Sequence, residues 1–246
     1  MTPRYLITGG SGFLGQALIK RLIERGNDNL VVLSRDEENL VILKDKFPQV
    51  EVIVGDIANM NNCDKACNGV DGIFHLAAFK HVGLAETNVA ECTNSNVIGS
   101  LNLLECTVKH NIDFIIGIST DKAAQLKGVY GVSKWLMERL FEDYERMNPR
   151  TKYRLVRYGN VLYSTGSVLC KWKDKIKNNE EIEKTDMEST RFYWTVDQAI
   201  DLIFECLMEA TDTTIFAHPM KSIKMKDLVE AMWEKYLPKD AIPKYK

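Results

Sequence analysis

The sequence has no long run of apolar residues. No segment approaches the roughly 20 consecutive apolar residues that a membrane-spanning helix needs, and the N-terminus MTPRYLITGG contains no apolar stretch of signal-peptide length. From these absences we expect a soluble, cytoplasmic protein with no membrane partner.

An excess of charge of one sign is also lacking. The 32 Lys and Arg residues stand against 34 Asp and Glu residues, which gives a formal net charge of −2. A chain balanced in this way has no global field that favours nucleic acid or an anionic membrane surface. Any anionic ligand must therefore be met by local groups.

The cysteines show neither a CxxC pair nor the spacing of a zinc site. Most of them lie inside apolar periodic runs, where cysteine behaves as a small hydrophobic residue. We therefore expect reduced thiols, as in a cytoplasmic protein, and no metal site. The six residues are Cys63, Cys67, Cys92, Cys106, Cys170 and Cys206.

Short apolar runs alternate with helical stretches over about the first 160 residues. Continuous apolar runs of this length are typical of parallel strands that are covered on both faces. The alternation predicts an α/β fold, a Rossmann-type doubly wound parallel sheet with right-handed crossovers. The expected strands lie within residues 4–10, 29–36, 50–56, 70–78, 112–120 and 152–162.

Periodicity weakens beyond this region. Three amphipathic segments, residues 167–184, 196–209 and 225–237, are expected to form a small C-terminal lobe. We therefore divide the chain into a Rossmann-type cofactor-binding domain, residues 1–165, and a small substrate-binding lobe, residues 166–246. The boundary is soft, because no low-complexity linker separates the two.

Glycines with the spacing GxxGxxG mark the turn between the first strand and the following helix. Without Cβ atoms the backbone can turn tightly and approach a pyrophosphate, whose charge then meets the helix N-terminus. A plain structural turn is the alternative, but the strand before the motif and the amphipathic helix after it supply the context of a dinucleotide site. The expected contacts are Gly9, Ser11, Gly12, Phe13, Leu14 and Gly15.

The end of the second strand favours NADP over NAD. An NAD site usually offers a carboxylate to the ribose 2′-hydroxyl, whereas a 2′-phosphate requires an arginine. Ser34 and Arg35 stand at this place, and Asp36 follows as a helix cap in the alternative interpretation. Asp56 and Ile57, after the third strand, are expected beside the adenine, although Asp56 could also cap a helix.

Tyr130 and Lys134 are four residues apart and therefore share one helix face. The ammonium can then lower the phenol pKa, which makes the tyrosine a usable base, and can hold a nicotinamide ribose. A YxxxK spacing alone is common in amphipathic helices. Its meaning here depends on the glycine turn and on Ser119-Thr120 at the end of the fifth expected strand.

Together these motifs resemble the extended branch of the short-chain dehydrogenase/reductase superfamily. The segments HLAAFKHV, STDKA, YGVSK, RYGNV and TRFYWTVDQA occur in the order seen in the UDP-N-acetylglucosamine 4,6-dehydratases, and they are most similar to the small members that also invert C5. The likeness spans residues 4 to 235. QLKG before the tyrosine and YSTGSVLCKW in the substrate loop depart from the family pattern.

The resemblance implies a redox-neutral dehydration at one sugar. Tyr130, with Thr120 and Lys134, would take the C4 hydroxyl proton while hydride passes to NADP⁺. Lys122 would then take the C5 proton, and a protonated Asp121 would donate to the departing C6 hydroxyl. Without the surrounding motifs, Asp121 and Lys122 would read as a solvated ion pair at a helix start.

The resemblance also assigns further contacts to the cofactor and the UDP-sugar. Additional cofactor neighbours are Ala77, Ala78, Lys80 and Asn96. Substrate neighbours are Lys80, Arg157, Tyr158, Asn160 and Arg191, because guanidinium groups suit phosphates, although each could be an ordinary strand-end polar residue. Relatives pair through the helix that carries Tyr130, so we expect a homo-oligomer, with Trp135, Leu136, Leu140 and Phe141 supplying apolar surface.

Two other functions remain open at this point. A nucleotide-sugar 4-epimerase or keto-sugar reductase shares the fold and YxxxK but does not need the Asp121-Lys122 pair. A catalytically silent NADP-binding protein would have lost a catalytic residue, and none is lost here.

Overall fold

The computed structural model describes residues 2–183, 186–238 and 241–245. Packing divides the chain into two compact units. The first holds Met1–Arg157 and Ile200–Ala217, and the second holds Tyr158–Ala199 and His218–Lys246.

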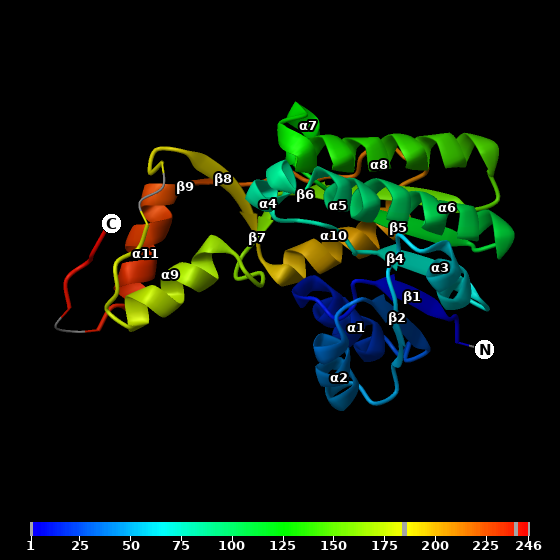
Figure 1. Cartoon of the computed structure of the whole chain (residues 1–246), viewed down its shortest axis with the longest axis horizontal. Helices are drawn as coiled ribbons and strands as arrows, with labels where there is room; N and C mark the ends of the chain where they lie inside the picture. Colours follow the sequence, from blue (N-terminus) through cyan, green and yellow to red (C-terminus); the bar gives the residue numbers. More distant parts are fainter. Residues whose placement is uncertain (1, 184–185, 239–240, 246) are drawn as a thin grey trace. The chain divides into compact units, whose positions relative to one another are not determined.

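The centre of the first unit is a six-stranded parallel sheet with the order β3-β2-β1-β4-β5-β6 (Figure 1). Its strand order reverses direction beside β1, as in a doubly wound Rossmann-type fold. The predicted fold class is confirmed, since every expected strand forms. The strands are β1 (Tyr5–Thr8), β2 (Leu30–Ser34), β3 (Glu51–Val54), β4 (Gly72–His75), β5 (Phe114–Thr120) and β6 (Lys152–Tyr158).

Helices cover both faces of this sheet. On one face, Leu6 of β1 and Ile115 of β5 share a buried core with side chains of α3, α6 and α8. On the other face, the ring of Phe204 in α10 contacts Phe74 of β4. The helices are α1 (Phe13–Glu24), α2 (Glu37–Lys46), α3 (Met60–Cys67), α4 (Val82–Thr87), α5 (Val89–Thr93), the π-helix η1 (Asn94–Ile98), α6 (Gly99–Lys109), α7 (Lys122–Gln125), α8 (Gly128–Met147) and α10 (Val196–Glu209).

The described part of the second unit contains a small sheet of order β7-β8-β9 and the helices α9 and α11. β7 pairs in parallel with β8, and β8 pairs antiparallel with β9. Leu169, Trp172 and Ile176 pack in one buried cluster with Val229 and Met232. The elements are β7 (Asn160–Val161), α9 (Val168–Lys177), β8 (Thr190–Trp194), β9 (Ser222–Lys224) and α11 (Met225–Tyr236).

The packing boundary lies at residues 157–158, before the expected residue 165, and residues 200–217 return to the first unit. The return has a physical cause, because Ile203 and Cys206 on α10 are fully buried and Phe204 meets β4. The sixth expected strand, residues 152–162, forms two strands, β6 and β7, with Gly159 between them. A Cβ on Gly159 would come within 2.6 Å of Phe192. The assignment of substrate binding to the C-terminal lobe stays a prediction.

Candidate active site

The glycine turn after β1 leaves no room for side chains. Gly9 has a φ of +68°, and a Cβ there would come within 2.9 Å of the Ala77 backbone. A Cβ on Gly15 would come within 2.5 Å of the Gly10 Cα. Gly12 precedes the first residue of α1, Phe13, so the turn delivers the chain directly into a helix N-terminus. The packing therefore requires Gly9 and Gly15, and it brings the first strand's loop against the loop after β4.

Polar groups at the end of β2 form a connected set. The Ser34 hydroxyl lies 2.8 Å from that of Ser11, which joins this strand end to the glycine turn. Arg35 donates to the Asp56 carboxylate over 3.3 Å, and its side chain is 55% exposed. Asp36 caps α2 by accepting a hydrogen bond from the Asn39 backbone, which also lowers the Asp36 pKa. The acid that follows Arg35 is thus engaged in a helix cap.

Asn96 organises the loop after β4. It is fully buried, its Oδ1 accepts from the Phe79 backbone at 2.8 Å, and its Nδ2 donates to the Phe79 carbonyl at 3.0 Å and to the Ser133 hydroxyl at 2.9 Å. The side-chain amide expected to touch a cofactor is therefore committed to the protein. Asn96 lies in the π-helix η1, and short π-helical segments are frequent at functional sites. Ala77 and Ala78 are half-buried in the same loop, and Lys80 is exposed.

Ile57 is buried rather than open to a ligand. A Cβ on Gly99 would come within 2.5 Å of its side chain, and its carbonyl accepts from Asn102 at 2.8 Å. Leu14 is half-buried in the first turn of α1.

Thr120, Asp121 and Lys122 stand together where β5 ends and α7 begins. The Thr120 hydroxyl donates to Asp121 Oδ1 at 2.9 Å, and Lys122 Nζ lies 3.1 Å from the same oxygen. Both charged side chains are partly buried, at 20% and 31% exposure. The absence of a Cβ on Gly131 lets α8 approach α7, because a Cβ there would come within 2.6 Å of the Lys122 carbonyl. This close approach brings the Asp121-Lys122 pair to the N-terminal turn of α8.

Tyr130 and Lys134 lie on one face of α8, as predicted, but they do not act on each other as expected. Burial raises the pKa of Tyr130 to about 12, although a hydrogen bond with Thr120 opposes this. Lys134 is 2% exposed, and burial lowers its pKa to about 8 against the opposing charge of Glu138. Its ammonium donates to the Met137 sulfur at 3.0 Å, a weak acceptor. The hydrogen bond with Thr120 is thus the contact that lowers the pKa of Tyr130, and the role of Lys134 toward the phenol stays a prediction.

Glu138 is a buried carboxylate that sequence reasoning missed. It lies one further turn along α8 and is fully buried. It accepts two hydrogen bonds from Arg157, at 2.7 and 2.5 Å, and one from Ser119. Arg157 was expected to meet the substrate, but its guanidinium is engaged in this pair. The signal available in the sequence was the i, i+4 spacing of Lys134 and Glu138.

His75 lies deep in the core. Its Nδ1 is 2.8 Å from the Thr8 hydroxyl and its Nε2 is 2.9 Å from the Ser100 hydroxyl. Burial, together with the charge of Lys134, lowers the pKa of His75 to about 3. The imidazole is therefore a neutral link between β1, β4 and α6.

The other expected substrate residues belong to the second unit. Tyr158 is buried, and Asn160 donates to the Phe192 carbonyl at 3.1 Å across β7 and β8. Arg191 is exposed and donates to the Thr190 carbonyl at 2.8 Å. Their role in substrate binding stays a prediction.

The residues present fit a dinucleotide with a nicotinamide ring. The glycine turn has no side chains at Gly9, Gly12 and Gly15, and the buried ammonium of Lys134 donates to the Met137 sulfur, its hydrogen-bond acceptor among the described residues. A buried cation without an oxygen partner is costly, and ribose hydroxyls would supply that partner.

Comparison with known proteins gives the family. The model of the polysaccharide biosynthesis protein family matches residues 5–244. The chain belongs to this family. An uncharacterized membrane protein of Methanocaldococcus jannaschii is 34% identical over 238 residues, which are 95% of this chain and 72% of that protein.

Other proteins that are similar to this chain carry more specific names. A UDP-glucose 4-epimerase of Rickettsia bellii is 33% identical over 237 residues, 92% of this chain and 69% of that one. Among solved structures, Pen from Bacillus thuringiensis superimposes with a TM-score of 0.95 at 30% identity, over 100% of this chain and 76% of that chain.

Within the described residues, no helix has both the length and the apolar character needed to cross a bilayer.

Proposed function

We propose that the chain is an NADP-dependent UDP-N-acetylglucosamine 4,6-dehydratase that inverts C5 and makes a UDP-4-keto-6-deoxy-N-acetylhexosamine for glycan biosynthesis. The observation that carries this proposal is the Asp121-Lys122 pair, 3.1 Å apart, directly after Thr120 and beside the helix of Tyr130. Oxidation at C4 alone needs only Tyr130, Thr120 and Lys134. An adjacent acid and base are the additional groups that an elimination requires.

The glycine turn with Ser11 and Ser34, and the ammonium of Lys134, are the groups that would hold the cofactor. When bound, the nicotinamide accepts a hydride from the sugar and later returns it. Arg35 supports NADP, because it is exposed and follows β2, while the neighbouring Asp36 is engaged as the cap of α2. The free thiols of all six cysteines support the proposal of a cytoplasmic enzyme.

Tyr130 is the proposed acceptor of the C4 hydroxyl proton. The Thr120 hydroxyl already lowers its pKa through a hydrogen bond, in opposition to burial. The ammonium of Lys134 would add to this effect in the cofactor complex, because a cation stabilises the phenolate.

Lys122 and Asp121 must exchange a proton before they can carry out elimination. As an ion pair, Lys122 is an ammonium and cannot accept a proton, and Asp121 is a carboxylate and cannot donate one. Transfer of one proton from Lys122 Nζ to Asp121 Oδ1 over their 3.1 Å contact produces a neutral amine and a carboxylic acid together. Exclusion of water by the bound sugar favours the neutral pair. The amine then takes the C5 proton, and the acid protonates the C6 hydroxyl as it leaves as water.

This elimination restores the starting charges. Lys122 is again an ammonium and Asp121 again a carboxylate, so the pair gains and loses no net charge. Protonation of C5 by the Lys122 ammonium on the opposite face of the sugar, together with the hydride that the cofactor would return to C6, would give the inverted product. Lys122 would then regain a proton from water, and Tyr130 would release to water the proton taken from the C4 hydroxyl.

A second candidate is a nucleotide-sugar 4-epimerase. It is favoured by the name of the Rickettsia bellii relative, which is 33% identical over 92% of this chain. An epimerase returns the hydride to C4 and leaves C5 and C6 untouched.

Proton NMR of UDP-N-acetylglucosamine incubated in D₂O with the purified protein and NADP⁺ separates the two candidates. The dehydratase produces a 6-methyl signal, deuterium at C5 and the inverted configuration. Formation of the C4 epimer with a fully protonated C5 supports the epimerase instead. If neither product forms, UDP-N-acetylglucosamine is not the substrate of this protein.

A further inference from the structure

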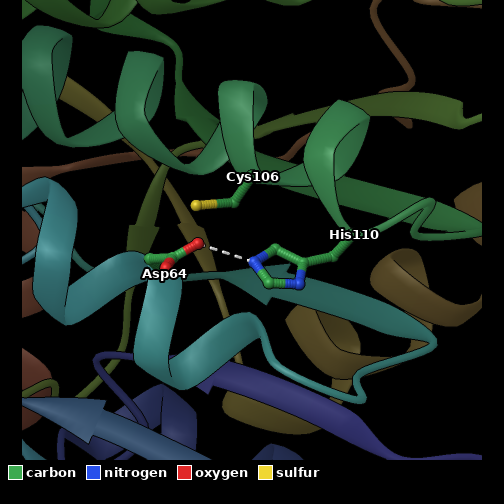
Figure 2. A group of neighbouring side chains, drawn as sticks. All are labelled: Asp64, Cys106 and His110. Atoms are coloured by element: carbon green, nitrogen blue, oxygen red, sulfur yellow. Dashed lines mark hydrogen bonds and ion pairs between the residues drawn. The ribbon is translucent and has the colours of Figure 1, made fainter.

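A second cluster of reactive side chains lies outside the candidate active site. Three side chains point toward one another (Figure 2). They are Asp64 on α3, Cys106 on α6 and His110 at the C-cap of α6. One carboxylate oxygen, the Cys106 sulfur and one ring nitrogen all lie within 4.8 Å of one another. Asp64 Oδ1 and His110 Nε2 are already 2.8 Å apart.

A second cysteine, Cys67, lies in the same buried core as Cys106. Asp64 and Cys67 are three residues apart on α3, and Cys106 and His110 are four residues apart on α6, so each pair shares one helix face. Two helices that pack together thus present an Asp-x-x-Cys pair and a Cys-x-x-x-His pair to each other.

We propose that Asp64, Cys106 and His110 form a binding site for a soft divalent cation of the Zn²⁺ class. A thiolate, an imidazole and a carboxylate are donors that Zn²⁺ accepts, and a water molecule can complete a four-coordinate site. Thiolate ligands disfavour Mg²⁺ and Ca²⁺, which prefer oxygen donors throughout.

Only local movement is needed to close the site. Ligand atoms around a tetrahedral Zn²⁺ are about 3.5 Å apart, so the outlying atoms must approach by about an ångström from their present separation of up to 4.8 Å. Lys109 must also leave, because its Nζ lies 2.6 Å from Asp64 Oδ1. The Lys109 side chain is 64% exposed, and it can turn into solvent without disturbing the core.

The cluster lies at the opposite edge of the sheet from the candidate active site. His110 precedes the first residue of β5, Phe114, whereas Thr120 is the last residue of that strand. The seven residues between these ends span about 20 Å. A bound cation would therefore tie α3 to α6 as a structural clamp, and this inference is independent of the proposed reaction.

The experiment measures metal binding by the whole reduced chain. Protein is stripped with a chelator, kept in a non-thiol reductant, loaded with Zn²⁺ and desalted, and its zinc content is measured by mass spectrometry. We expect one Zn²⁺ per chain and a higher melting temperature. Co²⁺ as a spectroscopic probe should show thiolate-to-cobalt charge-transfer absorption, which a carboxylate or histidine site lacks.

Variants separate this site from adventitious binding. Cys106→Ala and His110→Ala should each weaken Zn²⁺ binding at least about tenfold, whereas Cys206→Ala, a change at another buried cysteine, should bind as the wild type does. Lys109→Ala should tighten binding about threefold, because it removes the competitor for Asp64. Failure of the reduced wild type to retain Zn²⁺, or equal binding by Cys106→Ala and Cys206→Ala, contradicts the proposal.

Discussion

Glu138 and Arg157 form a two-contact ion pair between α8 and β6, with the Glu138 carboxylate fully buried and its oxygens 2.7 and 2.5 Å from the arginine nitrogens. The pair fixes the helix that carries Tyr130 and Lys134 against the sheet. A buried carboxylate requires such partners, because loss of one leaves an uncompensated charge.

We expect Arg157→Met to destabilise the protein by about 3–5 kcal/mol, because Glu138 then remains buried and unpaired. The double variant Arg157→Met with Glu138→Leu should recover much of this loss. Urea unfolding measures both free energies. Equal stability of the single variant and the wild type would show that the pair contributes nothing.

Replacement of Arg35 by Ala should weaken NADP binding far more than NAD binding. Only NADP loses a charge-assisted phosphate contact, which contributes about 1.5–3 kcal/mol. Isothermal titration calorimetry with both cofactors measures the difference. Arg146→Ala, a change at an exposed arginine on α8, is the matched control. Comparable losses for NADP and NAD would count against the assignment.

Lys122→Ala should separate elimination from oxidation. The variant keeps Tyr130 and Lys134, so the sugar can still be oxidised at C4 while dehydration stops and reduced cofactor accumulates. Tyr130→Phe should instead leave little reduced cofactor, because the first proton transfer is lost. Absorbance of the reduced nicotinamide and deuterium incorporation at C5 follow the two steps. Wild-type exchange at C5 in both variants would exclude the assigned roles.

His75 should make the fold sensitive to acid. Its pKa falls from 6.5 to about 3 on folding, so between these values the unfolded chain binds more protons and stability is lost as the pH decreases. His75→Gln should reduce the slope of unfolding free energy against pH by up to about 1.4 kcal/mol per pH unit. Urea unfolding between pH 6.5 and about 4 measures this slope, with His81→Gln as the exposed control. An unchanged slope in His75→Gln would refute the prediction.

Self-association through α8 remains a prediction with a revised surface. Phe141 was expected to be exposed, but it is fully buried in the core, because it packs beneath Gly117 of β5. Val132, Leu136 and, at the C-terminal end, Met147 are the exposed large apolar residues of this helix. Leu136→Asp should convert an oligomer to a monomer in sedimentation experiments, whereas Met208→Asp, at an exposed methionine of α10, should not. A monomeric wild type at micromolar concentration would refute the prediction.

The sequence by itself determined the sheet and the positions of the catalytic candidates along the chain. Strands such as Phe114–Thr120 are continuous apolar runs, and a local pattern is sufficient to identify them. The shared face of Tyr130 and Lys134 follows from helix geometry alone. The requirement for Gly15 is also local, since a Cβ there would meet Gly10, whereas the requirement for Gly9 comes from Ala77 in the loop after β4 and depends on the tertiary structure.

Only the tertiary structure decided which distant side chains meet. Arg157 looked available for a phosphate, but the fold places it against Glu138, 19 residues earlier in the chain. His110 contacts Asp64, 46 residues earlier in the chain, and Cys106 lies beside them although no metal-ligand spacing links the three in sequence. These pairings depend on how α3, α6, α8 and β6 pack, and packing joins residues whose separation along the chain carries no periodic signal.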